Sequence, residues 1–255
     1  MIVDQSKIEG MPMRHPFDFS MKGEVMYVFT DCRISAQAFQ ALHTFGHVPI
    51  PCTPHPALDP AIASHPDMLL FPCERGIFVL GGHKPATGVI PQLPIKQAPA
   101  KKYPHDVLLN AARIGHYLVC RPDSTAAKLL QYAKEADLTV LPVRQGYAKC
   151  NLCIVSDHAA VTEDASVAAA LRSVGIDVLQ IDAGGVALPG YPYGFIGGAS
   201  GSDGTHVFFC GDLSLHPDGK RIAAFCRKHA REPISLASHP MQDVGSLLFF
   251  QNQTD

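Results

Sequence analysis

Residues 152–157 read Leu152-Cys153-Ile154-Val155-Ser156-Asp157, an apolar run that ends in an acidic residue. Similar runs, each ending in an acidic or turn residue, begin at residues 25, 117 and 207. After each run come a helix of small residues and a second apolar run, with a period of about 35 to 45 residues, as in repeat folds whose units need their neighbours to bury a core. The sequence therefore predicts a fold built from repeated strand–helix–strand units.

The expected helices have one narrow apolar face each. They span residues 35–46, 124–137, 164–174 and 218–230, and the strands that follow them span 48–50, 138–143, 176–181 and 233–236. Ser35 and Gly46 suit the two ends of the first helix as N-cap and C′ residues. Inner strands are expected at 68–71, 152–155, 194–197 and 245–249. Narrow apolar faces can only cover the outside of an apolar layer, so we expect the strands to lie inside the helices.

The segment 76–97 contains turns and no helical pattern, and we interpret it as a degraded fifth unit. Residues 1–23 lack periodicity and are expected to form an N-terminal arm of a single domain, 1–255, whose repeats lie within 24–250. Five alike units are too regular for a doubly wound sheet with one switch point. They favour a closed ring of modules.

Composition limits the partners of the chain. Its 255 residues are 47% hydrophobic, which is enough for a large core, and its net charge is −2. Such a balance is not expected of a protein that binds nucleic acid or an anionic membrane. The eight cysteines, without a leader segment, predict free thiols and a cytoplasmic location, and no apolar run reaches the ~20 residues of a membrane helix. A small polar ligand remains the expected partner.

Polar residues recur just before the expected inner strands, where a ring would bring them together. They are Asp67, Asp106, Asn151, Tyr193 and Asp243. Carboxylates crowded around one opening repel each other unless a cation joins them, and a guanidinium pairs with carboxylates through two hydrogen bonds. Each residue alone is better explained as a turn former that caps local backbone groups. Together they predict a shared site for a small cation.

The chain resembles the pentein superfamily of guanidine-modifying enzymes from about Val25 to Phe250, and most clearly over residues 146–178 and on to Gly197-Gly198. This resemblance implies an α/β propeller of about five pseudo-symmetric units around a central pore. It also implies that Asp67 and Asp106 hold a substrate guanidinium. The superfamily usually places a nucleophilic cysteine at the last inner strand, where this chain has Ser246 and no cysteine, with His239 as the nearest base.

Cys150 is the second candidate nucleophile, because it adjoins Asn151. His65, His105 and His239 precede the acidic positions and are candidates for proton transfer, although histidines beside prolines also occur in ordinary turns. No second ligand pair completes a zinc site with Cys150 and Cys153, and no nucleotide-binding glycine motif occurs. The sequence thus predicts neither a metal nor a cofactor, and catalytic roles for Ser246, Cys150, His239 and His105.

Two functions follow from these residues. The first is binding of a small cationic guanidino or amino-acid-like ligand at a central acidic pore, with hydrolase or transferase chemistry at the guanidine carbon. The second is a non-catalytic interaction protein of the pentein fold that resembles translation initiation factor 6. The absent C-terminal cysteine favours the second, and the acidic positions favour the first. Fold alone does not decide between them.

Overall fold

The structure is a computed structural model that describes residues 26–88 and 90–251, so the expected N-terminal arm lies outside the described residues. Its strands form five small sheets of three strands each. The sheets are β15-β1-β2 (Leu248–Gln251, Met26–Asp31, Val48–Cys52), β3-β4-β5 (Leu70–Cys73, Gly76–Val79, Gln92–Pro94), β6-β7-β8 (Ala112–Ile114, Tyr117–Cys120, Thr139–Pro142), β9-β10-β11 (Cys153–Ser156, Ala159–Thr162, Asp177–Gln180) and β12-β13-β14 (Ser200–Ser202, His206–Phe209, Glu232–Ser235).

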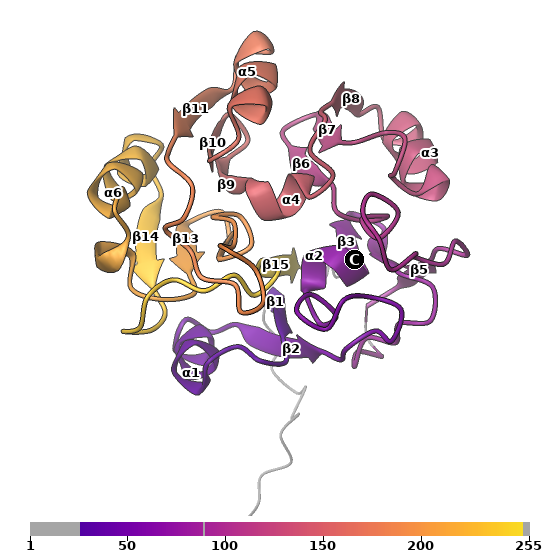
Figure 1. The fold of residues 1–255 in the computed structure, drawn as a ribbon, viewed down its shortest axis with the longest axis horizontal. Helices are drawn as coiled ribbons and strands as arrows, with labels where there is room; N and C mark the ends of the chain where they lie inside the picture. The colour runs from indigo at the N-terminus through magenta and orange to yellow at the C-terminus, as the bar shows by residue number, and fades with distance from the viewer. Residues whose placement is uncertain (1–25, 89, 252–255) are drawn as a thin grey trace, which may run out of the picture.

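Every sheet has the same pairing. The central strand pairs antiparallel with one neighbour and parallel with the other. The antiparallel partner of β1 is β15, so the first sheet joins the two ends of the described chain. In Figure 1 the five sheets lie around the middle of the molecule, in chain order from indigo to yellow. The mixed α/β architecture and its fivefold repetition agree with the prediction.

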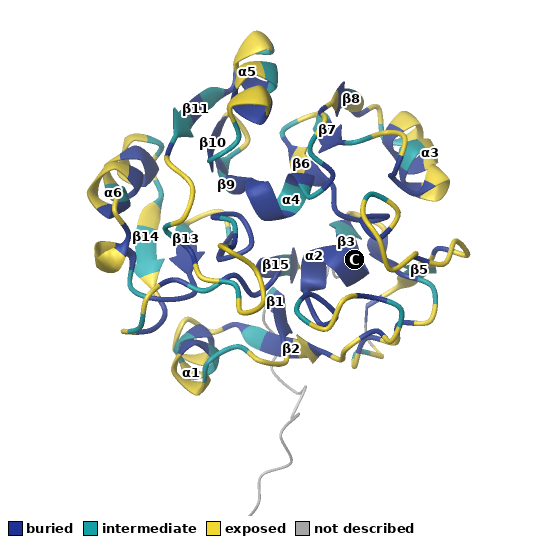
Figure 2. Ribbon diagram, viewed as in Figure 1, coloured by how far each residue is buried: buried dark blue, intermediate teal, exposed yellow. Residues whose placement is uncertain are grey.

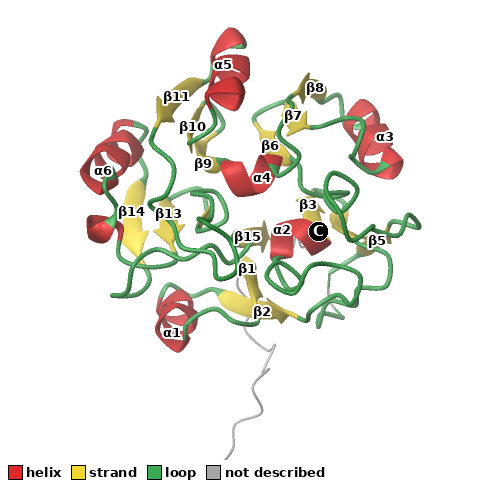
Figure 3. Ribbon diagram, in the orientation of Figure 1, coloured by secondary structure: helices red, strands yellow, loops and turns green. Residues whose placement is uncertain are grey.

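Of the six helices in the described residues, four each connect the two strands of a parallel pair and lie on the outside (Figure 3). They are α1 (Ala36–Thr44), α3 (Ala127–Glu135), α5 (Ala165–Ser173) and α6 (Gly219–Lys228). The two short helices α2 (Pro66–Leu69) and α4 (Ala148–Asn151) lie inside and lead into β3 and β9. A 3-10 turn at Leu213–Leu215 precedes α6. Among the described residues, no helix is long and apolar enough to cross a membrane.

Local sequence explains the outer helices. The Ser35 side chain accepts a hydrogen bond from the Ala38 N–H, and the Asp164 side chain accepts from two N–H groups at the start of α5, so both helices begin at a capping residue. Gly46 and Gly175 end α1 and α5 with φ of 81° and 83°, which an L-residue with a side chain rarely adopts. The outer faces of these helices are exposed, and the elements inside them are buried (Figure 2).

All four predicted outer helices are confirmed to within a few residues, and residues 76–97 supply two strands of a complete fifth sheet. The prediction of an inner strand at 194–197 is wrong, because that strand is β12 at Ser200–Ser202. The expected strand at 68–71 is half wrong: Pro66 starts a helical turn that includes Met68 and Leu69 before β3 begins. Strand β6 carried no sequence signal that we recognised, since it is only three residues long.

Candidate functional site

Two cavities lie near the point where the sheets meet. The first, called the site cavity below, has a volume of about 230 Å³. The second, of about 190 Å³, is lined by Lys149 of α4 and by residues in or directly beside the strands β3, β6, β9, β12 and β15, among them Leu70, Arg113, Ile154, Gly201 and Leu248. All five modules therefore contribute to one central space. The site cavity is lined by Ile62, His65, Met68, Tyr147, Cys150, Leu188, Tyr191, Pro192, Tyr193, Phe195 and Asp243.

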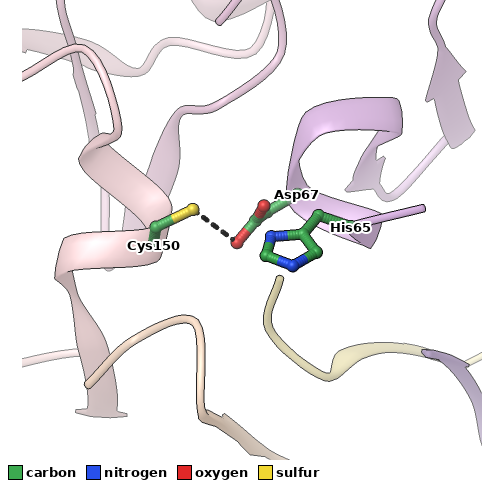
Figure 4. A group of neighbouring side chains, drawn as sticks. All are labelled: His65, Asp67 and Cys150. Carbon is green, nitrogen blue, oxygen red and sulfur yellow. Dashed lines mark hydrogen bonds between the residues drawn. The ribbon is translucent and has the colours of Figure 1, made fainter. Parts of the chain in front are cut away.

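The two short inner helices position the chemical groups at the floor of the site cavity. His65 is the N-cap residue of α2 and Asp67 lies in its first turn, while Cys150 lies in α4. Figure 4 shows the three side chains pointing toward one another from the two helices. One ligand-capable atom from each lies within 4.8 Å of those of the other two, and all three residues are buried. The floor thus combines an imidazole, a carboxylate and a thiol.

The Asp67 carboxylate is the centre of this group. Its Oδ2 accepts a hydrogen bond from Cys150 Sγ at 3.0 Å and another from Ser246 Oγ at 2.6 Å. Its Oδ1 is buried and has no hydrogen-bond partner in the described chain. Burial raises the pKa of Asp67 because the charged form loses water, and the charge of Lys149 opposes that rise. The carboxylate is therefore in a position to take up a proton or to bind a cation.

Lys149 and Ser246 link the second cavity to Asp67 through hydrogen bonds. Lys149 lines the second cavity, its Nζ donates to Ser246 Oγ at 3.0 Å, and Ser246 donates to Asp67. Ser246 is fully buried, does not line the site cavity and has a φ of 70°. Burial lowers the pKa of Lys149, and Asp67 opposes that fall. Hydrogen bonds thus join Lys149, Ser246 and Asp67 in series. Ser246 supports the site in this way but does not reach a ligand in the site cavity.

His65 lies between two carboxylates without a close hydrogen bond to either. Nε2 is 3.7 Å from Asp31 Oδ2, and Nδ1 is 3.8 Å from Asp243 Oδ1. In the described structure both ring nitrogens are buried without a hydrogen-bond partner. Burial lowers the pKa of His65 despite these carboxylates, so the ring is neutral near pH 7. Although burial opposes it, hydrogen bonds from Arg33 hold the pKa of Asp31 below its usual value, and Asp31 is therefore ionised.

Asn110 holds α4 in place next to the site. Its Oδ1 accepts from the backbone N–H of Lys149 at 2.8 Å and of Cys150 at 3.3 Å, and its Nδ2 donates to Cys150 Sγ at 3.1 Å. A donor at the sulfur favours the thiolate form. Even so, burial and the charge of Asp67 raise the pKa of Cys150 well above its usual value. Without a ligand, Cys150 is a protonated thiol.

One loop supplies the outer wall of the site cavity. Residues 188–195 contribute Leu188, Tyr191, Pro192, Tyr193 and Phe195 to the lining. The loop is fixed to the floor because Asp243 Oδ2 accepts from the Phe195 N–H at 2.9 Å. Tyr191 and Tyr193 are 42% and 43% exposed, so they stand at the mouth. The cavity has an aromatic mouth and an ionisable floor.

The structure brings together only some of the predicted site residues. Asp67, Cys150, Tyr193 and Asp243 lie in or beside the site cavity, with His65 from the histidine candidates. Asp106 and Asn151 are buried just outside its lining. Asp106 accepts a hydrogen bond from the Tyr147 hydroxyl at 2.8 Å. The Thr162 hydroxyl donates to the Asn151 side chain. Both residues support residues or strands around the cavity.

His105 and His239 lie elsewhere. His105 is exposed, and His239 Nδ1 is 2.8 Å from the carbonyl of Pro240. Neither lines the site cavity. The five polar positions are also not equivalent in the repeat, because Asp67 lies three residues before its inner strand, Asn151 two residues before and Asp243 five residues before.

Sequence reasoning did not name Lys149, Asn110, Tyr147 or the aromatic loop as parts of the site. A signal existed for Asn110: it lies two residues before β6, as Asn151 lies before β9 and Ser246 before β15. Aligning the repeats on their inner strands would have exposed this position. Tyr191 and Phe195 carry no such signal, because the loop that holds them belongs to one module alone.

A family model matches residues 29–248, and the chain therefore belongs to the family described as "Family of unknown function (DUF6873)". No curated protein matches the chain significantly, and no solved structure does.

Proposed function

We propose that this protein binds a small cationic guanidino or amino-acid-like ligand in the site cavity and acts on its guanidine carbon through Cys150. The observation that carries the proposal is the convergence of Cys150, Asp67 and His65 at the floor of a cavity with aromatic walls. Aromatic faces and buried carboxylates both attract a planar cation. A reducing compartment such as the cytoplasm suits this chemistry, since the thiol must stay reduced.

We further propose that the fold is a pentein-type α/β propeller. Three features support it: five sheets with one pairing pattern, the β15–β1 pairing that joins the two chain ends, and the first strands that surround one cavity. In such a ring the site cavity and the second cavity are the two ends of one pore. The Lys149–Ser246–Asp67 chain closes that pore in the middle.

The proposed reaction begins when the ligand cation reaches the floor. Its positive charge favours the Cys150 thiolate, and the thiol proton passes to Asp67, whose Oδ2 already accepts it. The sulfur forms a bond to the guanidine carbon, a carbon–nitrogen bond breaks, and the leaving amine takes the proton from Asp67. Water then attacks the carbon, neutral His65 accepts its proton, and the sulfur leaves and regains a proton from His65. The products are a ureido compound and an ammonium ion.

The test is incubation of the full chain with arginine, methylated arginines and agmatine in the presence of EDTA, followed by assay of the ureido product. We expect product from at least one of them, its loss in Cys150→Ser, and its retention in Cys153→Ser, which alters a buried thiol outside the site. No product from any of these compounds at high protein concentration would contradict the catalytic proposal.

Two observations favour the non-catalytic alternative, an interaction protein of the pentein fold. The thiol of Cys150 is protonated before a ligand arrives, and Ser246 is not accessible from the site cavity. Thermal stabilisation by a guanidino compound without turnover would support binding alone. Stabilisation that Asp67→Asn abolishes would assign that binding to the floor of the site cavity.

A further inference from the structure

We propose that His65, Asp67 and Cys150 bind one divalent transition-metal ion at the floor of the site cavity. The types of donor atom favour zinc. The three donor atoms lie within 4.8 Å of one another and come from buried residues. Imidazole nitrogen, carboxylate oxygen and thiolate sulfur are the three donor types of protein zinc sites. This inference does not depend on the guanidino proposal.

The geometry is close to that of a bound site. Zinc bonds of about 2.0 to 2.3 Å place tetrahedral donors about 3.3 to 3.8 Å apart. Cys150 Sγ and Asp67 Oδ2 are already 3.0 Å apart. Because the three donor atoms lie within 4.8 Å of one another, shifts of about 1 Å or less in side chains on two short helices would complete the set.

Unpartnered atoms point to a missing ligand. In the described part of the chain, both nitrogens of His65 and Oδ1 of Asp67 are buried without a hydrogen bond, although each residue is only 1% exposed. Buried polar atoms are normally paired, because an unmade hydrogen bond costs about 1 to 3 kcal/mol. A metal ion would satisfy a nitrogen of His65, and ligation through Oδ1, rather than the Oδ2 that already accepts two hydrogen bonds, would satisfy Asp67 as well.

The surroundings already resemble an outer shell for a metal. Whichever nitrogen of His65 binds the ion, the other faces a carboxylate, Asp31 at 3.7 Å or Asp243 at 3.8 Å. Asn110 donates to the sulfur of Cys150, and Ser246 donates to Asp67. Such outer partners orient the ligands of metal sites.

Three protein ligands leave a fourth tetrahedral position open. His65 and Cys150 both line the site cavity, so that position faces the cavity and not the protein interior. Catalytic zinc sites keep this arrangement, whereas structural ones use four protein ligands. The ion would coordinate the Cys150 thiolate and neutralise the Asp67 carboxylate. It would therefore exclude a guanidinium from the floor of the site cavity.

The decisive experiment adds Co²⁺ and Zn²⁺ to full-length protein that carries Cys32→Ser and has been freed of metal by chelation under reducing conditions. The Cys32 substitution removes the exposed thiol, which binds metals adventitiously. We expect one equivalent of Zn²⁺ by calorimetry and a thiolate-to-cobalt charge-transfer band with tetrahedral d–d bands. Absence of that band, or octahedral bands alone, would overturn the proposal without any change at the site.

Variants then assign the ligands. Cys150→Ser should abolish the charge-transfer band, and Asp67→Asn and His65→Asn should each weaken Zn²⁺ binding by more than ~100-fold, since even outer-shell changes cost 10- to 100-fold. Cys153→Ser should bind like the parent. Unchanged binding in Asp67→Asn and His65→Asn would overturn the assignment. Because guanidino binding is measured in EDTA and metal binding without guanidino compounds, failure of one proposal leaves the other standing.

Discussion

The two short helices α2 and α4 face each other across the site and carry opposite chemistry. Asp67 and Cys150 each lie three residues before the start of an inner strand, β3 and β9, so they occupy corresponding places in two modules. Beside them α2 has the imidazole of His65 and α4 has the ammonium of Lys149. One repeated backbone turn thus presents an anion and a base on one side and a thiol and a cation on the other.

The other three modules have Leu109, Gly197 and Gly245 at the same place, three residues before β6, β12 and β15. At the two glycine positions neighbouring atoms leave no room for a side chain. A Cβ on Gly245 would lie 2.1 Å from Cβ of His65, and one on Gly197 would lie 2.5 Å from backbone atoms of Cys150 and Leu152. Repetition supplies the scaffold, and differences among the copies make the site.

The largest expected effect comes from removing the cation of α4. Lys149→Met leaves the buried Asp67 carboxylate without its nearest positive charge, and we expect a loss of ~3 kcal/mol in the free energy of unfolding. Urea denaturation at pH 7 measures it. Lys128→Met, which removes an exposed lysine on α3, should change stability by less than ~0.5 kcal/mol.

The pair is tested by a double-mutant cycle. Lys149→Met with Asp67→Asn removes both charges, so the double variant should recover more than half of the loss caused by Lys149→Met alone. Additive losses from the two substitutions would show that Lys149 and Asp67 do not interact. The opposite charges on α2 and α4 would then not stabilise each other.

A second comparison concerns the acidic residues that end two central strands. Asp31 ends β1 and is paired with Arg33, whereas Glu163 follows β10 and has no cation among its neighbours in the described structure. Glu163 Oε1 accepts from the Ile196 N–H at 2.8 Å, and its Oε2 is buried without a partner. Burial raises the pKa of Glu163 to about 8, with a smaller contribution from Asp243, and Cys153 is the other titratable group nearby.

This shift predicts a pH dependence of stability. A carboxyl whose pKa is higher in the folded than in the unfolded state binds more protons when folded, so stability falls as the pH rises from about 4.5 to about 8. One pKa unit corresponds to ~1.4 kcal/mol, and partial hydration of the ionised group leaves an expected loss of ~2 kcal/mol.

Glu163→Gln should remove this loss. The variant should be more stable than the parent by ~2 kcal/mol at pH 9 and nearly equal to it at pH 5. Urea denaturation across this range tests the sign. Asp31→Asn is the contrasting substitution, because it should destabilise at pH 7, where Arg33 loses its ionised partner. An equal effect of Glu163→Gln at pH 5 and pH 9 would rule out titration of Glu163 as the cause.

Gly197→Ala tests the spatial role of the glycine opposite Cys150. The added Cβ would meet backbone atoms on both sides of the end of α4, which cannot move as a flexible side chain can. We expect a loss of ~1 to 3 kcal/mol in stability, as for overpacked cores. Gly88→Ala has open space around the new Cβ and serves as the control. If the two substitutions cost the same, close packing at α4 is not what requires Gly197.

Much of the fold was accessible from the sequence because its signals are local. The caps at Ser35 and Asp164 and the four amphipathic helices appear in single segments, and their recurrence predicts the modules. The strands β6 and β12 were missed or misplaced, since each has three residues, too few for alternation to show. Pairing with a neighbouring strand of the same sheet, β7 for β6 and β13 for β12, determines those strands rather than propensity.

The site was accessible only in part because its contacts are distant in sequence. Asp67 and Cys150 could be named singly, but their hydrogen bond joins residues 83 apart, and the bond of Ser246 to Asp67 joins residues 179 apart. No window of sequence contains such a pair. Ser246 was predicted as a nucleophile from its position in the sequence. Its hydroxyl instead donates to the Asp67 carboxylate, and the residue does not line the site cavity.

The smallest expected effect concerns the aromatic mouth, which lines the same cavity as His65 and Cys150. Tyr193 is 43% exposed and lines the site cavity, so the proposed cation would lie against its side chain. An exposed cation–π contact contributes ~0.5 to 1 kcal/mol, and Tyr193→Ala should therefore weaken binding of a guanidino compound roughly 2- to 5-fold. Calorimetric titration in EDTA measures the change. Tyr193→Phe keeps the ring and removes the hydroxyl, so it should bind like the parent. Equal weakening in both variants would assign the contact to the hydroxyl and show that the aromatic ring does not contribute to cation binding.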